Sequence, residues 1–426
     1  MSKEEQQTSK QPSGVATVAA AIAIQLTLGI AYLWGIFQKG VSLSIFNGNE
    51  ANAGLTFSIL LATLTVGSVF GGKLAAKYST RRVVFIGGVI LASGFLAASF
   101  VTSQNPWLLW ITYGVMGGTG MGFTYSTTIA AAQKWYPHKR GLITGVIVSA
   151  LGFGGVIFTP VIEGLVKAFG GRSVGEPKTF MVLAGVFLTV CTVGCLFIKN
   201  PPAATGAAAT AAAAAAKNDV SPSQMLRKPQ FYIITLAFAL ACMGGLMIIN
   251  HSKSIAEMKG FEPDVAAIGV IAISLFNSCG RLMWGIVSDK IGRINTIIIL
   301  TIGSVVPSLL IGFVQSWFIF ALIGLIGLLY GGLLSCFPSL TADVFGAKHL
   351  ATNYGFVLLG FGSGAIAASQ ISGKFKNAAN IAINEGISDG IAQMFPAFVI
   401  GASCATASML LIVLLRSMTK KAAKQS

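Results

Sequence analysis

The chain has 426 residues, of which 54% are hydrophobic and only 10% are charged, with a mean hydropathy of +0.77. Soluble proteins carry about 25% charged residues, so this composition excludes an ordinary soluble domain and indicates a surface that mostly contacts lipid. The net charge of +16 would suit nucleic-acid binding, but the basic residues gather in the loops on one side of the apolar segments. That asymmetry is the positive-inside pattern. It predicts cytoplasmic termini and no nucleic-acid partner.

The polar first residues, MSKEEQQTSKQPSG, lack the short apolar core and cleavage site of a secretory signal. Twelve apolar runs follow, each near the roughly 20 residues that cross a bilayer core. Backbone groups in lipid must be hydrogen-bonded internally, so the runs predict an all-α membrane protein with twelve transmembrane helices in the cell (inner) membrane. The runs lie near 15–37, 54–75, 83–102, 107–130, 142–166, 179–198, 230–252, 265–287, 296–315, 317–340, 354–373 and 393–415.

The longest gap between runs contains PPAATGAAATAAAAAAKNDVSP, a low-complexity linker with proline at both ends. It predicts a six-helix N-terminal half over residues 1–198, a cytoplasmic linker over 199–228 and a six-helix C-terminal half over 229–426. The halves repeat, because GGKLAAKYSTRR after the second run matches WGIVSDKIGR after the eighth and places Gly72 and Gly285 at equivalent positions. Repeats of this kind put a transporter's substrate site near the bilayer midplane, between the halves.

One arginine lies inside the eighth run. Arg281 precedes Asp289, at the cytoplasmic boundary, by two helical turns, which places it roughly 12 Å inside the bilayer. A cation at that depth costs on the order of 2.5–3.5 kcal/mol on insertion scales and usually faces a substrate path; a structural arginine bonded to backbone carbonyls is the alternative. Its guanidinium stays charged and matches a carboxylate in two-point fashion, and one turn earlier stands Asn277 rather than an acid. The segment therefore predicts an anionic substrate, most simply a carboxylate.

The stretch GIVSDKIGR resembles the loop signature that the major facilitator superfamily carries between the second and third helices of each half. The first-half copy departs from it, with Ala76 in place of the aspartate and Ser79 in place of the later glycine. The resemblance covers nearly the whole chain and implies a carrier that works by alternating access. We expect a monomer without a cofactor, in which Asp289, Arg293 and Asp343 hold cytoplasmic loops together in one gating state.

The stretch FNSCGRLMWG resembles the eighth helix of monocarboxylate transporters and of the bacterial oxalate/formate antiporter family. GIAYLW in the first helix, KWYPHKRGL after the fourth, CFPSLTADVFG in the tenth and NYGF in the eleventh point the same way. Oxalate-handling members place a lysine in the eleventh helix, where this chain has Phe361. They also carry aromatic residues at three positions that are leucine here, Leu151, Leu334 and Leu358.

Animal-type monocarboxylate carriers depart in another way, with an aspartate where this chain has Asn277 and a first-helix lysine where it has Ile36. Together these departures imply a pocket with one cation, mixed aromatic and aliphatic walls and no second charge. Such a pocket favours a small monocarboxylate, of the lactate or pyruvate type, over a dicarboxylate.

Other pocket candidates come from the helices that line the superfamily's cavity. A tyrosine hydroxyl can donate to a carboxylate while the ring packs against a short carbon chain, although each such residue alone is as often a packing residue. The predicted substrate-binding residues are Arg281, Asn277, Tyr32, Leu28, Tyr125, Leu151, Tyr330, Leu358 and Phe361, with Gln25 as a weaker candidate.

The proton-coupling candidate is His251, near the outer end of the seventh helix, because imidazole titrates near neutral pH. A hydrogen-bonded histidine at the water interface is the simpler interpretation. Glu257 and Glu163 are weaker options, and the proton can also travel on the substrate carboxylate itself.

Other functions fit the sequence less well. GGTGMG resembles a dinucleotide-binding fingerprint but sits inside an apolar run without a preceding strand, so close helix packing explains it better. The three histidines do not cluster and the six cysteines lie inside predicted spans, which argues against a metal site. A membrane enzyme would need paired carboxylates or a nucleophile with its base, and a cation exporter would need a buried acid. A protein that senses a solute remains an open alternative. Proton-coupled symport of a monocarboxylate is the favoured prediction, with carboxylate exchange as the alternative.

Overall fold

The computed structural model describes residues 14–171, 174–202, 219–387 and 390–425, and every regular element in these ranges is a helix. The earlier helices are α2 (Gly14–Leu28), η1 (Gly29–Tyr32), α3 (Trp34–Ser44), α4 (Glu50–Lys77), α5 (Thr80–Ala98), α6 (Trp107–Leu109), η2 (Trp110–Gly117), α7 (Gly118–Trp135), α8 (Arg140–Ala168) and α9 (Gly175–Phe197). The later helices are α11 (Pro222–Met225), α12 (Pro229–Ile249), α13 (Ser252–Met258), α14 (Pro263–Ile291), α15 (Arg293–Leu310), α16 (Phe318–Phe345), α17 (Leu350–Asn384) and α18 (Ile391–Gln425).

The all-α membrane fold is confirmed, with two of the predicted spans interrupted. Ten helices in the described ranges are long and apolar enough to cross a membrane. The first predicted span is divided into α2, the 3-10 helix η1 and α3, and the fourth into α6, the π-helix η2 and α7. The helices of the last two spans extend beyond the predicted apolar runs, because α17 continues to Asn384 and α18 to Gln425.

The interruption of the first span lies where its backbone touches α8. A Cβ atom on Gly29 would stand 2.3 Å from the carbonyl oxygen of Leu151, so only glycine allows this approach. Short 3-10 segments inside longer helices often mark hinges, and interrupted helices in transporters occur where the backbone lines a cavity. The first span is therefore irregular at the point where its backbone contacts α8.

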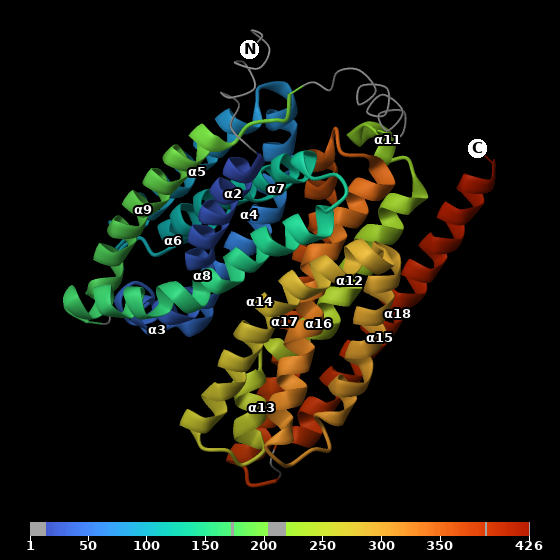
Figure 1. Cartoon of the computed structure of the whole chain (residues 1–426). Coiled ribbons are helices and arrows are strands. Elements are labelled where there is room, and N and C mark those ends of the chain that lie inside the picture. Colours follow the sequence, from blue (N-terminus) through green and yellow to red (C-terminus); the bar gives the residue numbers. More distant parts are fainter. Residues whose placement is uncertain (1–13, 172–173, 203–218, 388–389, 426) are drawn as a thin grey trace.

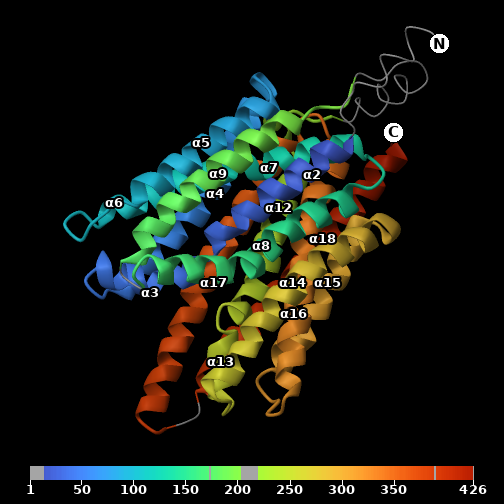
Figure 2. The same cartoon turned by 60° about the vertical axis from the view of Figure 1, so that its left-hand side comes forward.

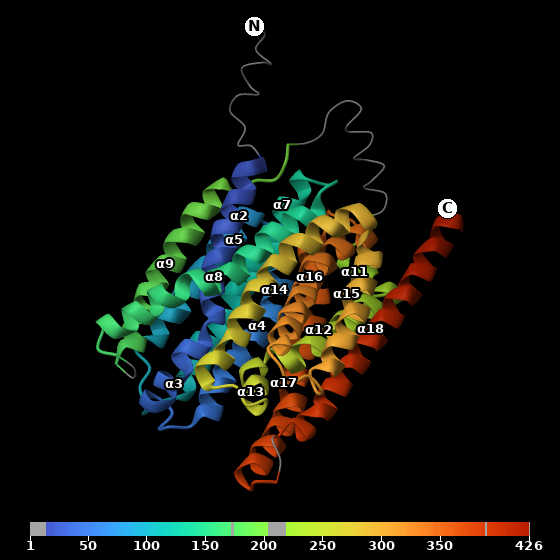
Figure 3. The ribbon, with the colours of Figure 1, turned by 60° about the horizontal axis from the view of Figure 1, so that its bottom comes forward.

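The two groups of helices lie side by side and meet mainly through α4, α8, α14 and α17 (Figure 1). In the first group α4 packs on α7, α5 on α9 and α2 on α8; in the second, α14 packs on α16, α12 on α17 and α18, and α15 on α18. Between the groups, α8 packs on α14 and α4 on α17. Figures 2 and 3 show the same division from two other sides, with α5 and α9 along the outside of one group in Figure 2 and α18 along the outside of the other in Figure 3. The boundaries at 198 and 229 stay a prediction, although α9 ends and α12 begins beside them.

Glycines bring the two groups together through backbone contacts. A Cβ atom on Gly285 of α14 would stand 2.4 Å from the carbonyl oxygen of Gly141 on α8, and one on Gly72 of α4 would stand 2.4 Å from the amide nitrogen of Thr352 on α17. Close approaches of this kind need small residues in membrane helices. Gly72 and Gly285 are the repeated residues of the sequence motif, so the repeat builds the same contact twice.

A second repeated contact relates Arg281 to a counterpart in the first half. A Cβ atom on Gly145 would meet the carbonyl oxygen of Arg281 at 2.6 Å, and one on Gly355 would meet the carbonyl oxygen of Ser68 at 2.7 Å. Ser68 therefore occupies on α4 the place that Arg281 occupies on α14. The backbone is repeated at this level, whereas the charge is present in one half only.

Candidate functional site

A cavity of about 480 Å³ lies between the two groups of helices. Residues of α4, α7 and α8 line one side, and residues of α12, α14, α16 and α17 line the other. The cavity extends from Arg281, within α14, to Asn250 and Ser369, toward the end of the molecule that carries α13 (Figure 1). Its size suits a small molecule, since ligand cavities typically measure about 300–1,000 Å³. Under the predicted orientation it faces the outside of the cell.

Arg281 is the single charged residue among the side chains that line the cavity, within the part of the chain that the structure describes. Arg281 is only 7% exposed. The guanidinium donates from Nε to Asn277 Oδ1 at 3.1 Å and from Nη1 to the carbonyl oxygen of Val148 on α8 at 2.8 Å. These two bonds leave Nη2 without a hydrogen-bond partner in the described residues. The N–H groups of Nη2 are left to a ligand, and a fixed guanidinium with free N–H donors is suited to a charge-assisted contact with a carboxylate.

The backbone around Arg281 is fixed by neighbours on both sides. Its carbonyl oxygen accepts a hydrogen bond from Ser335 Oγ of α16 at 2.7 Å. On α8, Gly145 leaves room for that same carbonyl, and a Cβ atom on Gly152 would stand 2.3 Å from Ser278 Oγ. Arg281 thus lies at the junction of α8, α14 and α16, where its position is set before any ligand arrives.

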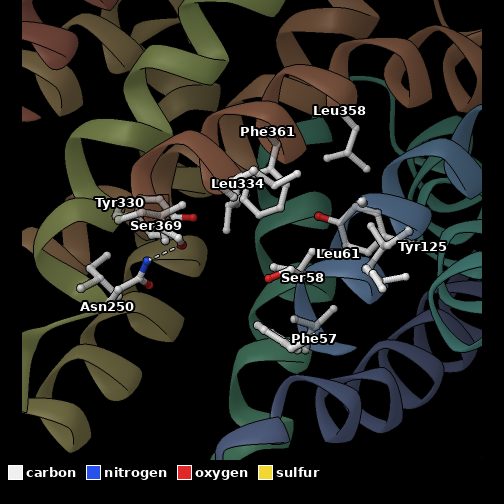
Figure 4. A pocket seen from close by; sticks show the side chains of 18 of the residues that line it. Phe57, Ser58, Leu61, Tyr125, Asn250, Tyr330, Leu334, Leu358, Phe361 and Ser369 are labelled. Carbon is white, nitrogen blue, oxygen red and sulfur yellow. Dashed lines mark hydrogen bonds between the residues drawn. The ribbon is translucent and has the colours of Figure 1, made fainter. Parts of the chain in front are cut away.

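The cavity walls combine aromatic, aliphatic and amide side chains. Tyr125, Tyr330 and Phe361 are each nearly buried, and Phe361 packs against Phe238 with ring centroids 5.9 Å apart. The amide side chains on the walls are Asn250, Asn277 and Gln370. Gln25, the weaker candidate, does not line the cavity: it is buried in α2, where its amide donates to the Tyr125 carbonyl oxygen at 3.2 Å and to Thr128 Oγ1 at 3.0 Å. Figure 4 shows the two walls facing each other, with one side formed by Tyr330, Asn250 and Ser369 and the other by Phe57, Ser58, Leu61 and Tyr125.

The predicted gating residues lie together at the opposite end of the two groups, near the starts of α8 and α15. Both carboxylate oxygens of Asp289 accept backbone N–H bonds at the start of α8, from Gly141 at 3.0 Å and from Leu142 at 2.8 Å. Arg293 donates to the same carboxylate and lies 3.5 Å from Asp343. Arg140 of α8 pairs with Asp343 at 3.0 Å. A carboxylate at a helix N-terminus is stabilised by the helix dipole. This network therefore holds the two groups together at the end of the molecule opposite α13.

His251 lies outside the cavity wall, just beyond the end of α12. Its Nε2 is hydrogen-bonded to Ser372 Oγ at 2.9 Å. Burial, and secondarily the charge of Lys376, lower the pKa of the imidazole to about 4. The ring is therefore neutral at physiological pH, which does not support the assignment of proton handling to this residue.

Comparison with known proteins identifies the family. The sequence matches the model of the Major Facilitator Superfamily over residues 14–369 and 254–423. The chain belongs to this superfamily. It is therefore a multi-pass membrane transporter, and members of the superfamily are generally carriers without catalytic activity.

Relatives within the superfamily include the two groups named from the sequence. An uncharacterized transporter of the superfamily from Escherichia coli K12, YhjX, is 32% identical over 356 residues, which cover 82% of this chain and 85% of the relative. The oxalate:formate antiporter of Oxalobacter formigenes is 29% identical over 349 residues, which cover 80% and 79%. Bovine monocarboxylate transporter 1 is 28% identical over 200 residues, which cover 46% of this chain and 38% of the relative.

Solved structures of the superfamily share the fold. The transporter FucP in its outward conformation aligns with a TM-score of 0.67 at 14% identity, covering 93% of this chain and 98% of that one. The proton:xylose symporter XylE aligns with a TM-score of 0.66 at 16% identity, covering 92% and 94%. At these identities the similarity establishes the architecture only.

Most residues predicted for the pocket of this superfamily member do line the cavity. They are Arg281, Asn277, Tyr125, Leu151, Tyr330, Leu358 and Phe361, together with Leu334. Leu28 does not: it is fully buried in the core, and the cavity lining excludes it. The side chain of Tyr32 lies outside the described part of the structure. The roles of all these residues stay predictions.

Sequence reasoning missed the α4 wall and the distal rim of the cavity. The missed residues include Phe57, Ser58, Leu61, Leu64, Asn250 and Ser369. The internal repeat could have found part of the α4 wall, because the register that pairs Ser68 with Arg281 also pairs Leu64 with Asn277. Asn250 and Ser369, which bond to each other at 3.1 Å, carry no comparable signal.

Proposed function

We propose that this protein is a secondary active transporter that carries small monocarboxylates, of the lactate or pyruvate type, by alternating access. The observation that supports it most is Arg281, the one charged side chain on the described cavity wall, with Nη2 left without a partner among the described residues. We place the protein in the cell inner membrane as a monomer with both termini cytoplasmic.

The charge of the cavity supports a monoanion over a dianion. One guanidinium neutralises one carboxylate, whereas the second carboxylate of oxalate or succinate would enter a mainly apolar cavity without a partner. Phe361, where oxalate-handling relatives are expected to carry a lysine, is packed against Phe238 and brings no charge. The short aliphatic part of lactate would lie against Tyr125 and Leu151 on the facing wall.

Substrate binding can be linked to the change of access through the bond between Arg281 and Val148. This bond joins α14 to α8, the pair of helices that also carries the Asp289 contact. A carboxylate that competes for the guanidinium would weaken this link between the halves. The Asp289 network and the hydroxyl pair of Thr144 on α8 and Ser339 on α16, 3.3 Å apart, would then be among the polar restraints that remain on opening toward the cytoplasm.

Coupling to protons is the favoured mode, with the proton carried on the substrate carboxylate. No carboxylate and no histidine line the cavity within the described residues, and the imidazole of His251 is neutral at physiological pH because its pKa is about 4. The same observation favours carboxylate exchange as the second candidate, since an empty carrier would keep Arg281 uncompensated while it reorients. The oxalate:formate antiporter among the relatives is consistent with that mode.

Proteoliposomes distinguish the two modes. Uptake of labelled lactate is measured under an imposed pH gradient, acidic outside, with and without a protonophore, and with or without unlabelled lactate inside. Symport predicts gradient-driven uptake into empty vesicles that the protonophore abolishes. Uptake that ignores the gradient and requires internal carboxylate identifies an exchanger, and no uptake of any monocarboxylate in either format overturns the proposed substrate class.

A further inference from the structure

A second hollow lies far from the cavity, on the outer side of the first group of helices. It measures about 480 Å³ and lies between α5 and α9, which pack side by side (Figure 2). Arg81, Arg82 and Ser79 line one end, at the start of α5, and Phe85 and Leu196 are among the apolar residues that line the rest. We call it the α5/α9 groove.

The groove crosses the boundary between water and lipid. Its polar end lies on the same side as the start of α2, because Thr17 of α2 donates to the carbonyl oxygen of Phe197 at the end of α9 at 3.0 Å. Phe85 lies one helical turn beyond Arg81, so roughly 6 Å deeper in the membrane. Phe85 and Leu196 are 42% and 48% exposed on the outer surface, where a transmembrane protein meets acyl chains.

The two arginines of the groove have no acidic partner in the described residues. The ion pairs found there join Arg140 and Arg293 to Asp343, Arg293 to Asp289, and Lys253 to Glu257. In the register that pairs Gly72 with Gly285, Ala76 stands where Asp289 stands and Thr80 where Arg293 stands, so the first half lacks this ion pair. Both arginines also lie in the first turn of α5, where the helix dipole disfavours a cation. Both side chains are exposed, so an anion from outside the chain can reach them and would be stabilised at this helix start.

We propose that the α5/α9 groove binds an anionic phospholipid. Arg81 and Arg82 donate to the phosphate oxygens of the headgroup, and one acyl chain lies over Phe85, Ile86 and Leu196. Arginine matches phosphate through parallel N–H bonds, and basic pockets at the edge of transmembrane helices suit lipid headgroups. The apolar floor distinguishes this ligand from free phosphate, which would gain nothing from it. The groove is separate from the transport cavity, so the proposal does not depend on the substrate.

Native mass spectrometry of the purified full-length protein tests this proposal, with phosphatidylglycerol and phosphatidylcholine of the same acyl chains as probes. The wild type is expected to retain phosphatidylglycerol in preference. The double variant Arg81→Gln/Arg82→Gln is expected to bind it at least roughly tenfold more weakly, since each charge-assisted contact is worth about 1.5 kcal/mol or more. The matched control is Arg227→Gln/Lys228→Gln, which removes an exposed basic pair elsewhere on the same side and should bind as the wild type does.

Two further arms identify the source of the phosphate and guard against misfolding. Phe85→Gln keeps both arginines and is expected to weaken phosphatidylglycerol binding several-fold, with an unchanged melting temperature in detergent. Inorganic phosphate at millimolar concentration is expected to leave the lipid bound. Retention by the folded arginine variant, equal loss in the Arg227/Lys228 control, no effect of Phe85→Gln, or displacement by inorganic phosphate would each overturn a phospholipid site.

Discussion

Replacement of Asp289 by asparagine should shift the protein away from the conformation in which the cavity is open at the α13 end. The carboxylate accepts two backbone N–H bonds from α8, at 3.0 and 2.8 Å, and pairs with Arg293. The amide keeps one acceptor oxygen, but its NH₂ group would face a second N–H donor. A hydrogen bond to a charged group is worth about 1.5–3 kcal/mol, so loss of one such bond costs this conformation about 2 kcal/mol. That energy corresponds to a roughly 30-fold change in the ratio of the two conformations.

The assay measures access to the cavity from the α13 end. A cysteine introduced at Ser58, on the α4 wall, is labelled with a membrane-impermeant thiol reagent in oriented proteoliposomes. Asp289→Asn should slow labelling by up to the same roughly 30-fold factor, by an amount set by how fully the wild type occupies this conformation. Lys290→Gln is the matched control, because Lys290 is the next residue, is exposed and belongs to none of the ion pairs found. Equal labelling rates in the Asp289 variant and the wild type would refute a gating function for this carboxylate.

Two other predictions concern charge. Phe361→Lys adds a second cation to the cavity wall and should raise competition by oxalate relative to lactate by roughly tenfold. The measurement is the ratio of their inhibition constants in lactate uptake, with Phe361→Leu as the control. An unchanged ratio would contradict the proposal that a single cation selects the substrate. His251→Ala should leave the pH profile of lactate uptake between about pH 5 and 8 within twofold of the wild type. The pKa of this imidazole is lowered to about 4, so it gains a proton only as the pH falls below that window; a displaced profile would show that His251 does titrate during transport.

The sequence predicts the membrane fold well because lipid imposes simple requirements. Helices are needed to satisfy the backbone, and each needs about 20 apolar residues. The interruption of the first span was missed for the same reason: GIAYLW is apolar throughout, and the break arises from the approach of Gly29 to Leu151 on another helix. A contact between segments more than a hundred residues apart leaves no mark in local hydropathy.

Residues of the candidate site could be predicted where the residue type is energetically costly in a membrane, and could not be predicted where that type is common in membrane helices. Arg281 stands out because a cation in an apolar run needs a reason, and the structure places it on the cavity wall. Leu28 was expected there too, but it is the last residue of α2, directly before the 3-10 helix η1, and its side chain is buried in the core. Burial of His251 was equally invisible, since it depends on the packing of α17 against the end of α12.

The central claim is that Arg281 binds the carboxylate of a small monoanion, and lactate uptake by Arg281 variants in proteoliposomes tests it most directly. Loss of a two-point charged contact should cost about 3 kcal/mol or more, so Arg281→Ala should lose roughly 100-fold or more of its uptake efficiency. Arg281→Lys, which keeps the charge but not the fork, should also be strongly impaired. Cys279→Ser, at an exposed position on the same helix, should transport normally and report on folding. If Arg281 binds the carboxylate, both Arg281 variants should have a normal melting temperature and lose most of their lactate uptake; near-normal uptake by Arg281→Ala would contradict this assignment.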